Sequence, residues 1–195
     1  MCEKAVIRVS GKNNRLVLGN NVHLGRVTFD FRGDNNVVEI EDNVLLRGSI
    51  LVHEGSRIRI GAGTKFHFNA VLEAREATTI DMGKGCLISQ VRLTTCDVHS
   101  VFDLETGARI NRSRDIKLHD HVWLAYDVMV CKGSEIGPDS VVGAKALVAG
   151  KFPANCVIGG NPANVIRKGI TWDHRSLDRL PDHDGAPSLR GSVAA

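Results

Sequence analysis

The chain has 195 residues, a formal net charge of +3, and a composition that is 43% hydrophobic but only 5% aromatic. This length suffices for one domain with a buried core, and the mild positive charge, with no basic run interleaved with aromatics, does not indicate a nucleic-acid partner. No apolar run approaches the ~20 residues of a transmembrane helix, and the five cysteines form no CxxC pair. We therefore expect a cytoplasmic protein with reduced thiols.

The first segment, residues 1–17, precedes any repeat. We expect it to form an N-terminal cap with a strand within residues 1–12, because the open end of a coiled structure needs to be covered.

A six-residue repeat occupies residues 18–169. It runs without a slip from Leu118 to Pro153, where each unit opens with one aliphatic residue: Leu118, Leu124, Val130, Ile136, Val142 and Val148. Earlier units are interrupted, and their openers are Leu18, Leu24, Ile40, Leu46, Val52, Ile60, Phe66, Leu72, Met82, Ile88 and Thr94. A period of six fits neither a helix nor a plain alternating strand. It predicts an all-β fold, a parallel β-helix of hexapeptide repeats with three hexads in each triangular coil.

Residues 100–117 interrupt the repeat with a polar stretch that lacks aliphatic openers. We expect a loop extruded from a corner of the coil just after His99. Long loops in compact domains are usually functional.

The repeat stops after Arg167. Residues 170–180 carry apolar side chains at Ile170, Leu177 and Leu180, which predicts one short helix closing this end. Residues 181–195 are rich in small and polar residues and are expected to be a flexible tail.

Two aromatic rings are predicted to project from the outer surface. Side chains alternate along a strand, so the residue five positions after an inward-facing opener points outward. Counted from Thr94 this residue is His99, and counted from Leu118 it is Trp123. Asp97 and Asp103 flank His99, and a carboxylate beside an imidazole can orient it for general-base chemistry. Trp123 is expected to form a wall of a binding site, and the alternatives are a subunit contact or an anchor for the loop.

Taken together, the hexads, the Asp97-x-His99-x-x-x-Asp103 stretch, Val122-Trp123-Leu124 and Gly160-Asn161-Pro162-Ala163 resemble the hexapeptide-repeat acyltransferases. The resemblance covers about residues 40–170 and is nearest to the bacterial polysaccharide O-acetyltransferases. It implies a left-handed β-helix, an exception to the right-handed crossover rule. It also implies a homotrimer that holds acetyl-CoA, as co-substrate, between neighbouring subunits. The implied reaction requires no metal.

The same resemblance assigns roles to particular residues. His99 would be the base and Trp123 would line the acceptor site. The pantetheine and nucleotide of acetyl-CoA would contact small and basic residues: Ala125, Gly143, Ala144, Lys151, Pro162, Arg167 and Lys168. The sequence departs from the family pattern at Ala125, where glycine is usual, and near Lys151, where the cation falls one place later than usual.

We therefore expect an acetyltransferase that acetylates a hydroxyl of a carbohydrate acceptor. Three alternatives remain open: N-acetylation of an amino sugar or nucleotide sugar, a non-catalytic β-helix, and metal chemistry on the same fold using His119 and His121.

Overall fold

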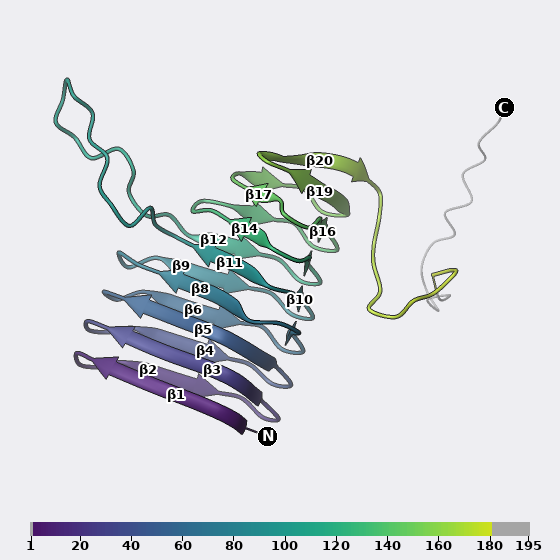
Figure 1. Cartoon of the computed structure of the whole chain (residues 1–195), viewed down its shortest axis with the longest axis horizontal. Helices are drawn as coiled ribbons and strands as arrows, with labels where there is room; N and C mark the ends of the chain where they lie inside the picture. Colours follow the sequence, from purple (N-terminus) through teal and green to yellow (C-terminus); the bar gives the residue numbers. More distant parts are fainter. Residues whose placement is uncertain (1, 181–195) are drawn as a thin grey trace.

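The computed structural model describes residues 2–180, and every regular element among them is a β-strand. The strands stack in parallel into a three-faced solenoid (Figure 1). The predicted all-β parallel β-helix is therefore confirmed. The predicted flexible tail, residues 181–195, lies outside the described residues. No helix in the described part of the chain is long and apolar enough to cross a membrane.

Face 1 of the prism is a seven-stranded parallel sheet with one strand from each coil. Its strands are β2 (Arg15–Leu18), β4 (Val37–Ile40), β6 (Arg57–Ile60), β9 (Thr79–Met82), β12 (Ile116–Leu118), β15 (Glu135–Ile136) and β18 (Lys151–Phe152).

Faces 2 and 3 belong to one sheet that bends around a corner, because β3 (His23–Arg32) and β5 (Leu45–His53) extend across both faces. Face 2 adds β7 (Lys65–Phe66), β10 (Leu87–Ile88), β13 (Trp123–Leu124), β16 (Val141–Val142), β19 (Cys156–Gly160) and the antiparallel β20 (Ala163–Lys168). Face 3 adds β1 (Cys2–Ser10), β8 (Ala70–Ala74), β11 (Val91–Thr94), β14 (Val128–Val130) and β17 (Leu147–Val148).

Three corners separate the faces, and one coil serves to define them. Corner A, between faces 1 and 2, holds residues 119–122 of that coil. Corner B, between faces 2 and 3, holds residues 125–127, and corner C, between faces 3 and 1, holds residues 131–134.

The hexad openers form continuous columns in the core. On face 1 the register joins them from coil to coil in the order Leu18, Ile40, Ile60, Met82, Leu118, Ile136 and Phe152. All but the first and last are buried. Because apolar burial is the main favourable term in folding, this stack explains how a chain with few aromatics builds a core.

Two predicted openers are wrong. The face 3 column passes through Ile50 and Leu93, which pair with Leu72, instead of through Val52 and Thr94. Corner B is shorter in these two coils: β5 crosses it as one continuous strand, and Leu93 follows Ile88 by five positions instead of six.

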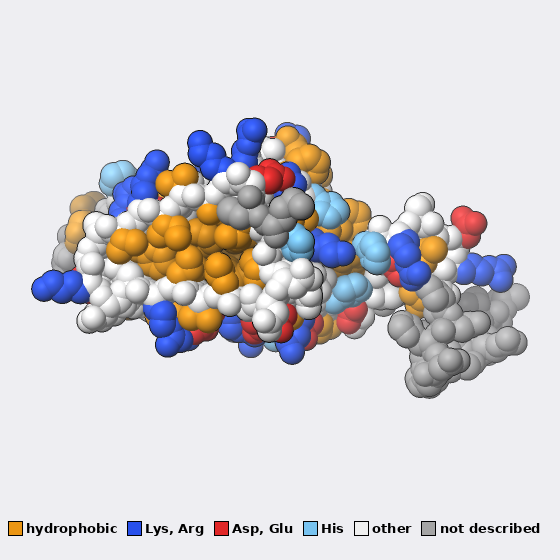
Figure 2. All heavy atoms as spheres, turned by 90° about the horizontal axis from the view of Figure 1, so that it is seen from below, with side chains coloured by type: hydrophobic (Ala, Val, Ile, Leu, Met, Phe, Trp, Pro, Cys, Tyr) orange, Lys and Arg blue, Asp and Glu red, His pale blue; other side chains and the backbone are white. Residues whose placement is uncertain are grey.

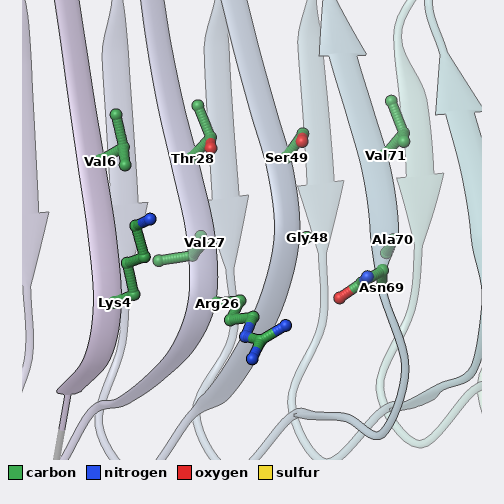
Figure 3. A pocket seen from close by; sticks show the side chains of 10 residues that line it. All are labelled: Lys4, Val6, Arg26, Val27, Thr28, Gly48, Ser49, Asn69, Ala70 and Val71. Atoms are coloured by element: carbon green, nitrogen blue, oxygen red, sulfur yellow. The ribbon is translucent and has the colours of Figure 1, made fainter.

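Outward-facing positions also align, one from each coil. Figure 3 shows such a row, in which Val6, Thr28, Ser49 and Val71 are consecutive register partners on face 3. The row lines an open hollow of about 320 Å³ with the long side chains of Lys4 and Arg26 at its edge.

The N-terminal strand β1 is a rung of the solenoid, since it pairs in parallel with β3. Its residues Ile7 and Val9 align with the buried Phe29 and Phe31 but are 57% and 58% exposed. Figure 2 looks at this end from below and shows apolar side chains gathered across it. The strand expected near the N-terminus is present, but among residues 2–180 no segment covers its inner side.

Between β11 and β12 the chain runs away from the coils and returns (Figure 1). Phe102 and Arg109 form an antiparallel bridge within this segment. Strand β12 begins at Ile116, so residues 116 and 117 of the expected loop belong to face 1.

The short helix predicted for residues 170–180 is wrong. The segment has bends and no regular element. It is held by side-chain contacts with corner A, among them the indole N–H of Trp172, which donates to the carbonyl of His121 over 2.7 Å. Tertiary contacts have overridden the local apolar spacing.

Candidate functional site

His99 lies at corner C, five residues beyond the end of β11, and is exposed to solvent as expected, although the opener of its unit is Leu93 and not Thr94, from which it was counted. Its main chain is fixed, because its N–H donates to the Asp97 carbonyl over 2.7 Å and its carbonyl accepts from Asn111 Nδ2 over 2.8 Å. Within residues 2–180 its imidazole makes no hydrogen bond. A fixed backbone with an unengaged ring leaves the imidazole available to a substrate.

Asp97 is held by two residues that sequence reasoning missed. Its Oδ2 accepts from Lys132 Nζ and, over 2.9 Å, from Asn111 Nδ2. Lys132 Nζ also donates to the Asn111 carbonyl over 3.0 Å. The ammonium of Lys132, assisted by Asn111, lowers the pKa of Asp97. The carboxylate of Asp97 therefore fixes the main chain around His99 instead of contacting its ring.

Asp103 was expected to lie beside the His99 ring, but its carboxylate accepts hydrogen bonds within its own turn. Its Oδ1 accepts from the main-chain N–H groups of Glu105 and Thr106, over 3.1 and 2.8 Å, and from the Thr106 hydroxyl over 2.8 Å. These bonds lower the pKa of Asp103 and close a turn at the tip of the loop. The predicted carboxylate–imidazole pair is not formed within the protomer.

A second contact ties the loop to the solenoid at Glu76. Arg109 donates to Glu76 Oε1 over 2.6 Å, and the Ser113 N–H donates to Oε2 over 3.1 Å. Arg109 and the Ser113 amide together lower the pKa of Glu76 to about 2. Glu76 therefore attaches the loop to the solenoid at a place separate from the contacts around Asp97.

Trp123 lies at the start of β13, beside corner A, and is partly exposed. Its indole ring is 5.8 Å from the ring of Trp172, which stacks on the His121 imidazole at 4.1 Å with an angle of 8°. The position of Trp172 was missed, although a second tryptophan beyond the end of the repeat was a usable signal.

His99 and Trp123 occupy different corners of the same prism. Strand β12 runs from corner C to corner A, and a hexad at the usual rise per residue spans roughly 20 Å. The structure therefore does not bring the imidazole and the indole together within one protomer.

The small residues expected to contact pantetheine line corner B. Ala125 donates its N–H to the Val142 carbonyl, and Gly143 donates to the Ile158 carbonyl, so the two lie one coil apart. Ala144 follows Gly143 and is exposed. Pro162 lies in the turn between β19 and β20, just past the strand end that pairs with β16. These four positions form one edge with little side-chain bulk.

The three basic residues of the expected set are spread more widely. Arg167 and Lys168 pair with Val157 and Cys156 at the far end of β20, toward corner A. Lys151 lies on face 1 and forms an ion pair with Glu135 over 3.2 Å. Lys151 is therefore separated from the edge that Ala125, Gly143 and Ala144 form.

His119 and His121, considered as a chelating pair, have different partners. His119 Nε2 lies 2.9 Å from Glu135 Oε1, and His121 Nδ1 lies 2.8 Å from Asp139 Oδ1. Over residues 2–180 no group of three or more potential metal ligands is present.

Comparison with known proteins finds relatives named as O-acetyltransferases. The chain is 34% identical over 150 residues to a polysialic acid O-acetyltransferase of Escherichia coli O1:K1, covering 75% of this chain and 48% of that protein. It is 31% identical over 129 residues to the polysialic acid O-acetyltransferase of Neisseria meningitidis, covering 65% of this chain and 60% of the relative. A galactoside O-acetyltransferase of Lactococcus lactis is 30% identical over 143 residues, with 72% of this chain and 67% of the relative covered. The chain thus spans about half to two thirds of the length of these relatives.

Two solved structures match most of the chain. The polysialic acid O-acetyltransferase OatWY superimposes with a TM-score of 0.84 and 27% identity, covering 91% of each chain. The polysialic acid-specific acetyltransferase NeuO gives a TM-score of 0.78 and 27% identity, covering 93% of this chain and 86% of that one. No family model matches the sequence.

A parallel solenoid of hexad repeats is the fold of the class of hexapeptide-repeat transferases. With these relatives, the chain belongs to the family of hexapeptide-repeat O-acetyltransferases.

Proposed function

We propose that this protein transfers the acetyl group of acetyl-CoA to a hydroxyl of a carbohydrate, with His99 as general base. The family supports acetyl transfer, and relatives named for polysialic acid and for galactoside support a carbohydrate acceptor. The observation that carries the proposal is His99 itself, whose exposed, unengaged ring is attached to a firmly held main chain.

In the proposed reaction, His99 removes the proton of the acceptor hydroxyl as its oxygen attacks the thioester carbonyl. A C–O bond forms and the C–S bond breaks, and the imidazolium returns the proton to the departing sulfur. No covalent acyl-enzyme is needed, because holding both substrates together supplies much of the rate advantage. The Trp123 main-chain N–H already donates to the Ser140 carbonyl. The indole N–H is thus the donor that Trp123 can offer to an oxyanion.

Acetyl-CoA is proposed to lie along corner B, where Ala125, Gly143, Ala144 and Pro162 leave its pantetheine access to the backbone. Arg167 and Lys168 are proposed to lie toward the phosphates, since both are exposed cations. Lys151 is not included among the proposed contacts to acetyl-CoA, because it lies on face 1 and pairs with Glu135.

The proposal requires more than one copy of the chain. Corner B and corner C are separated by the whole of face 3, so one protomer cannot bring Gly143 next to His99. A left-handed, homotrimeric arrangement, as the family resemblance implies, would place corner B of one protomer beside corner C of the next. The site would then be shared between neighbours.

The test is release of free CoA thiol by purified protein given acetyl-CoA and a panel of sialic acid and galactose acceptors. We expect His99→Ala to lower kcat by 10²–10⁴-fold, about the value of a general base. Substitution of the exposed His23 on face 2 by alanine serves as the matched control. Near-normal transfer by a folded His99→Ala protein would refute the assignment.

The position of the acetyl group separates the alternatives. Mild alkali removes an ester acetyl from oxygen but leaves an amide acetyl on nitrogen, and mass spectrometry reads the difference. An alkali-stable product would favour an N-acetyltransferase. No transfer to any acceptor and no binding of acetyl-CoA would favour a non-catalytic β-helix.

A further inference from the structure

The chain after β20 returns along corner A, against the direction in which the coils stack. The Ile170 N–H donates to the Asn155 carbonyl over 3.0 Å, and the Thr171 hydroxyl donates to Asp139 Oδ1 over 3.2 Å. These two corner residues have the same left-handed backbone, with φ of 56° and 57°, and lie in successive coils. The returning segment is therefore seated on the regular corner of the solenoid.

Trp172 follows and reaches one coil further. Its stacking on His121 and its hydrogen bond to the His121 carbonyl place its ring next to Trp123. The chain contains only two tryptophans. Both of them are at this corner.

A pocket of about 540 Å³ lies between the returning segment and corner A. It is lined by His121, Asp139, Asn155, Thr171, Trp172, Asp173, Arg175 and Leu180. Its volume and its combination of one large aromatic ring with a few polar groups are typical of a small-molecule site.

Polar groups in the walls of the pocket are paired with one another. His121 Nδ1 lies 2.8 Å from Asp139 Oδ1. Arg175 donates to both carboxylate oxygens of Asp173, over 3.0 and 2.8 Å, and holds the pKa of Asp173 well below its usual range. Because Arg175 is taken up by Asp173 and the Asp139 carboxylate also lies in the wall, the pocket does not favour an anionic ligand.

The remaining surface of the pocket suits a sugar ring. The Thr171 hydroxyl oxygen, Asp139 Oδ2 and the Asn155 side-chain oxygen remain as acceptors for ligand hydroxyls, and the second Asn155 amide proton remains as a donor. Trp172 and Leu180 offer apolar surface to the C–H face of a ring.

We propose that this pocket is a second sugar subsite, which binds a ring of the acceptor adjacent to the ring that receives acetyl. Trp172 is its specificity-determining residue, and recognition is through hydroxyls instead of a carboxylate. The inference rests on the proposed function, in which Trp123, next to Trp172, acts at the carbon that the acceptor hydroxyl attacks.

Calorimetric binding to the full chain without acetyl-CoA gives the first test. The probes are methyl galactoside and a galactose oligosaccharide. We expect the oligosaccharide to bind about tenfold more tightly, a difference of about 1.4 kcal/mol. Trp172→Ala should abolish this difference, and Trp172→Phe should retain most of it. Equal binding of both probes by the unaltered chain would overturn the subsite.

Kinetics give the second test, with monosaccharide and oligosaccharide forms of galactose as acceptors. Trp172→Ala should raise KM for oligosaccharides about tenfold while KM for monosaccharides and for acetyl-CoA stays within about twofold. Equal effects on monosaccharides and oligosaccharides would overturn the proposal, because Trp172 would then only support Trp123. Circular dichroism and size-exclusion chromatography check that each variant folds.

The two proposals can fail separately. If the unaltered protein acetylates no carbohydrate, the proposed function fails, whereas Trp172-dependent binding of the oligosaccharide by calorimetry would still support the sugar pocket. If acetylation occurs but Trp172→Ala leaves every KM unchanged, the subsite alone fails.

Discussion

At the residue scale, the main chain around His99, the proposed general base, is held without a carboxylate contact to the His99 ring. Asn111 and Lys132 converge on Asp97, and Asn111 also holds the carbonyl of His99. The Lys132 side chain is only 13% exposed. A largely buried, paired ammonium is costly to remove, because its removal leaves the partner groups unsatisfied.

We therefore expect Lys132→Met to lower kcat about tenfold, with little change in KM for acetyl-CoA, because His99 loses its position but remains present. Lys132→Arg should restore part of the rate. The control is Lys145→Met, since Lys145 is 78% exposed and also pairs with an aspartate. Unchanged kcat in Lys132→Met would show that this network has no part in positioning His99.

The Glu76 carboxylate should make the attachment of the loop depend on pH. Its pKa of about 2 lies below the ordinary 4.5, so this carboxylate favours the attached loop above pH 4.5 and loses that effect as the pH falls toward 2. The Ser113 amide, which donates to Glu76, should report this by a shift in its NMR frequency between those values. Glu76→Gln should remove the titration. A midpoint near 4.5 would mean that Arg109 does not hold Glu76 in solution.

The repeat register predicted the outward position of Trp123, because its opener Leu118 is correct, whereas His99 was counted from the wrong opener and stood out by its flanking aspartates. Sequence reasoning could not find Lys132, which is 35 residues from Asp97. Only the three-dimensional stacking of one corner on the next brings the two together. Sequence reasoning also assigned Asp103 to the His99 ring, whereas Asp103 accepts hydrogen bonds from the nearby Glu105 and Thr106.

At the scale of elements, face 1 carries charges of alternating sign. The outward column joins Glu39, Arg59, Asp81, Lys117, Glu135 and Lys151 in register from β4 to β18. Opposite charges on neighbouring strands stabilise pairing, and like charges disfavour it. This pattern helps specify the register of parallel strands as short as two residues.

Lys117→Glu would place a third carboxylate between Asp81 and Glu135. We expect the Tm to fall by a few degrees at low salt and to recover largely in high salt, because exposed charges are screened. Lys65→Glu is the matched control, since its neighbours in register are Leu45 and Leu87. Equal losses of Tm in both variants would contradict a stabilising role for the alternating charges of face 1.

The hexad pattern predicted the parallel columns from residue 118 to 152 because each unit there has the same length. It placed Val52 and Thr94 wrongly because corner length varies in the early coils. The helix expected at residues 170–180 failed for another reason. Three apolar residues gave a weak local signal, whereas Trp172 makes its contacts with a corner some 51 residues away.

At the scale of the whole molecule, the separation of His99 and Trp123 is the main consequence of the prism. The two residues lie at opposite ends of face 1, and corner B is the third edge. A monomer would therefore present three incomplete parts of a site. Association around a threefold axis would join different corners of neighbouring copies in a closed ring.

Mixing two defective variants tests this arrangement. His99→Ala and Trp123→Ala should each have low activity alone, because each removes one half of every site. Co-expressed with different affinity tags and purified through both, they should form mixed trimers. If His99 of one protomer acts with Trp123 of the next, each mixed trimer holds one intact site, and about a third of the unaltered activity should return. If both residues act from the same protomer, no mixed trimer contains an intact site and activity stays at the level of the single variants.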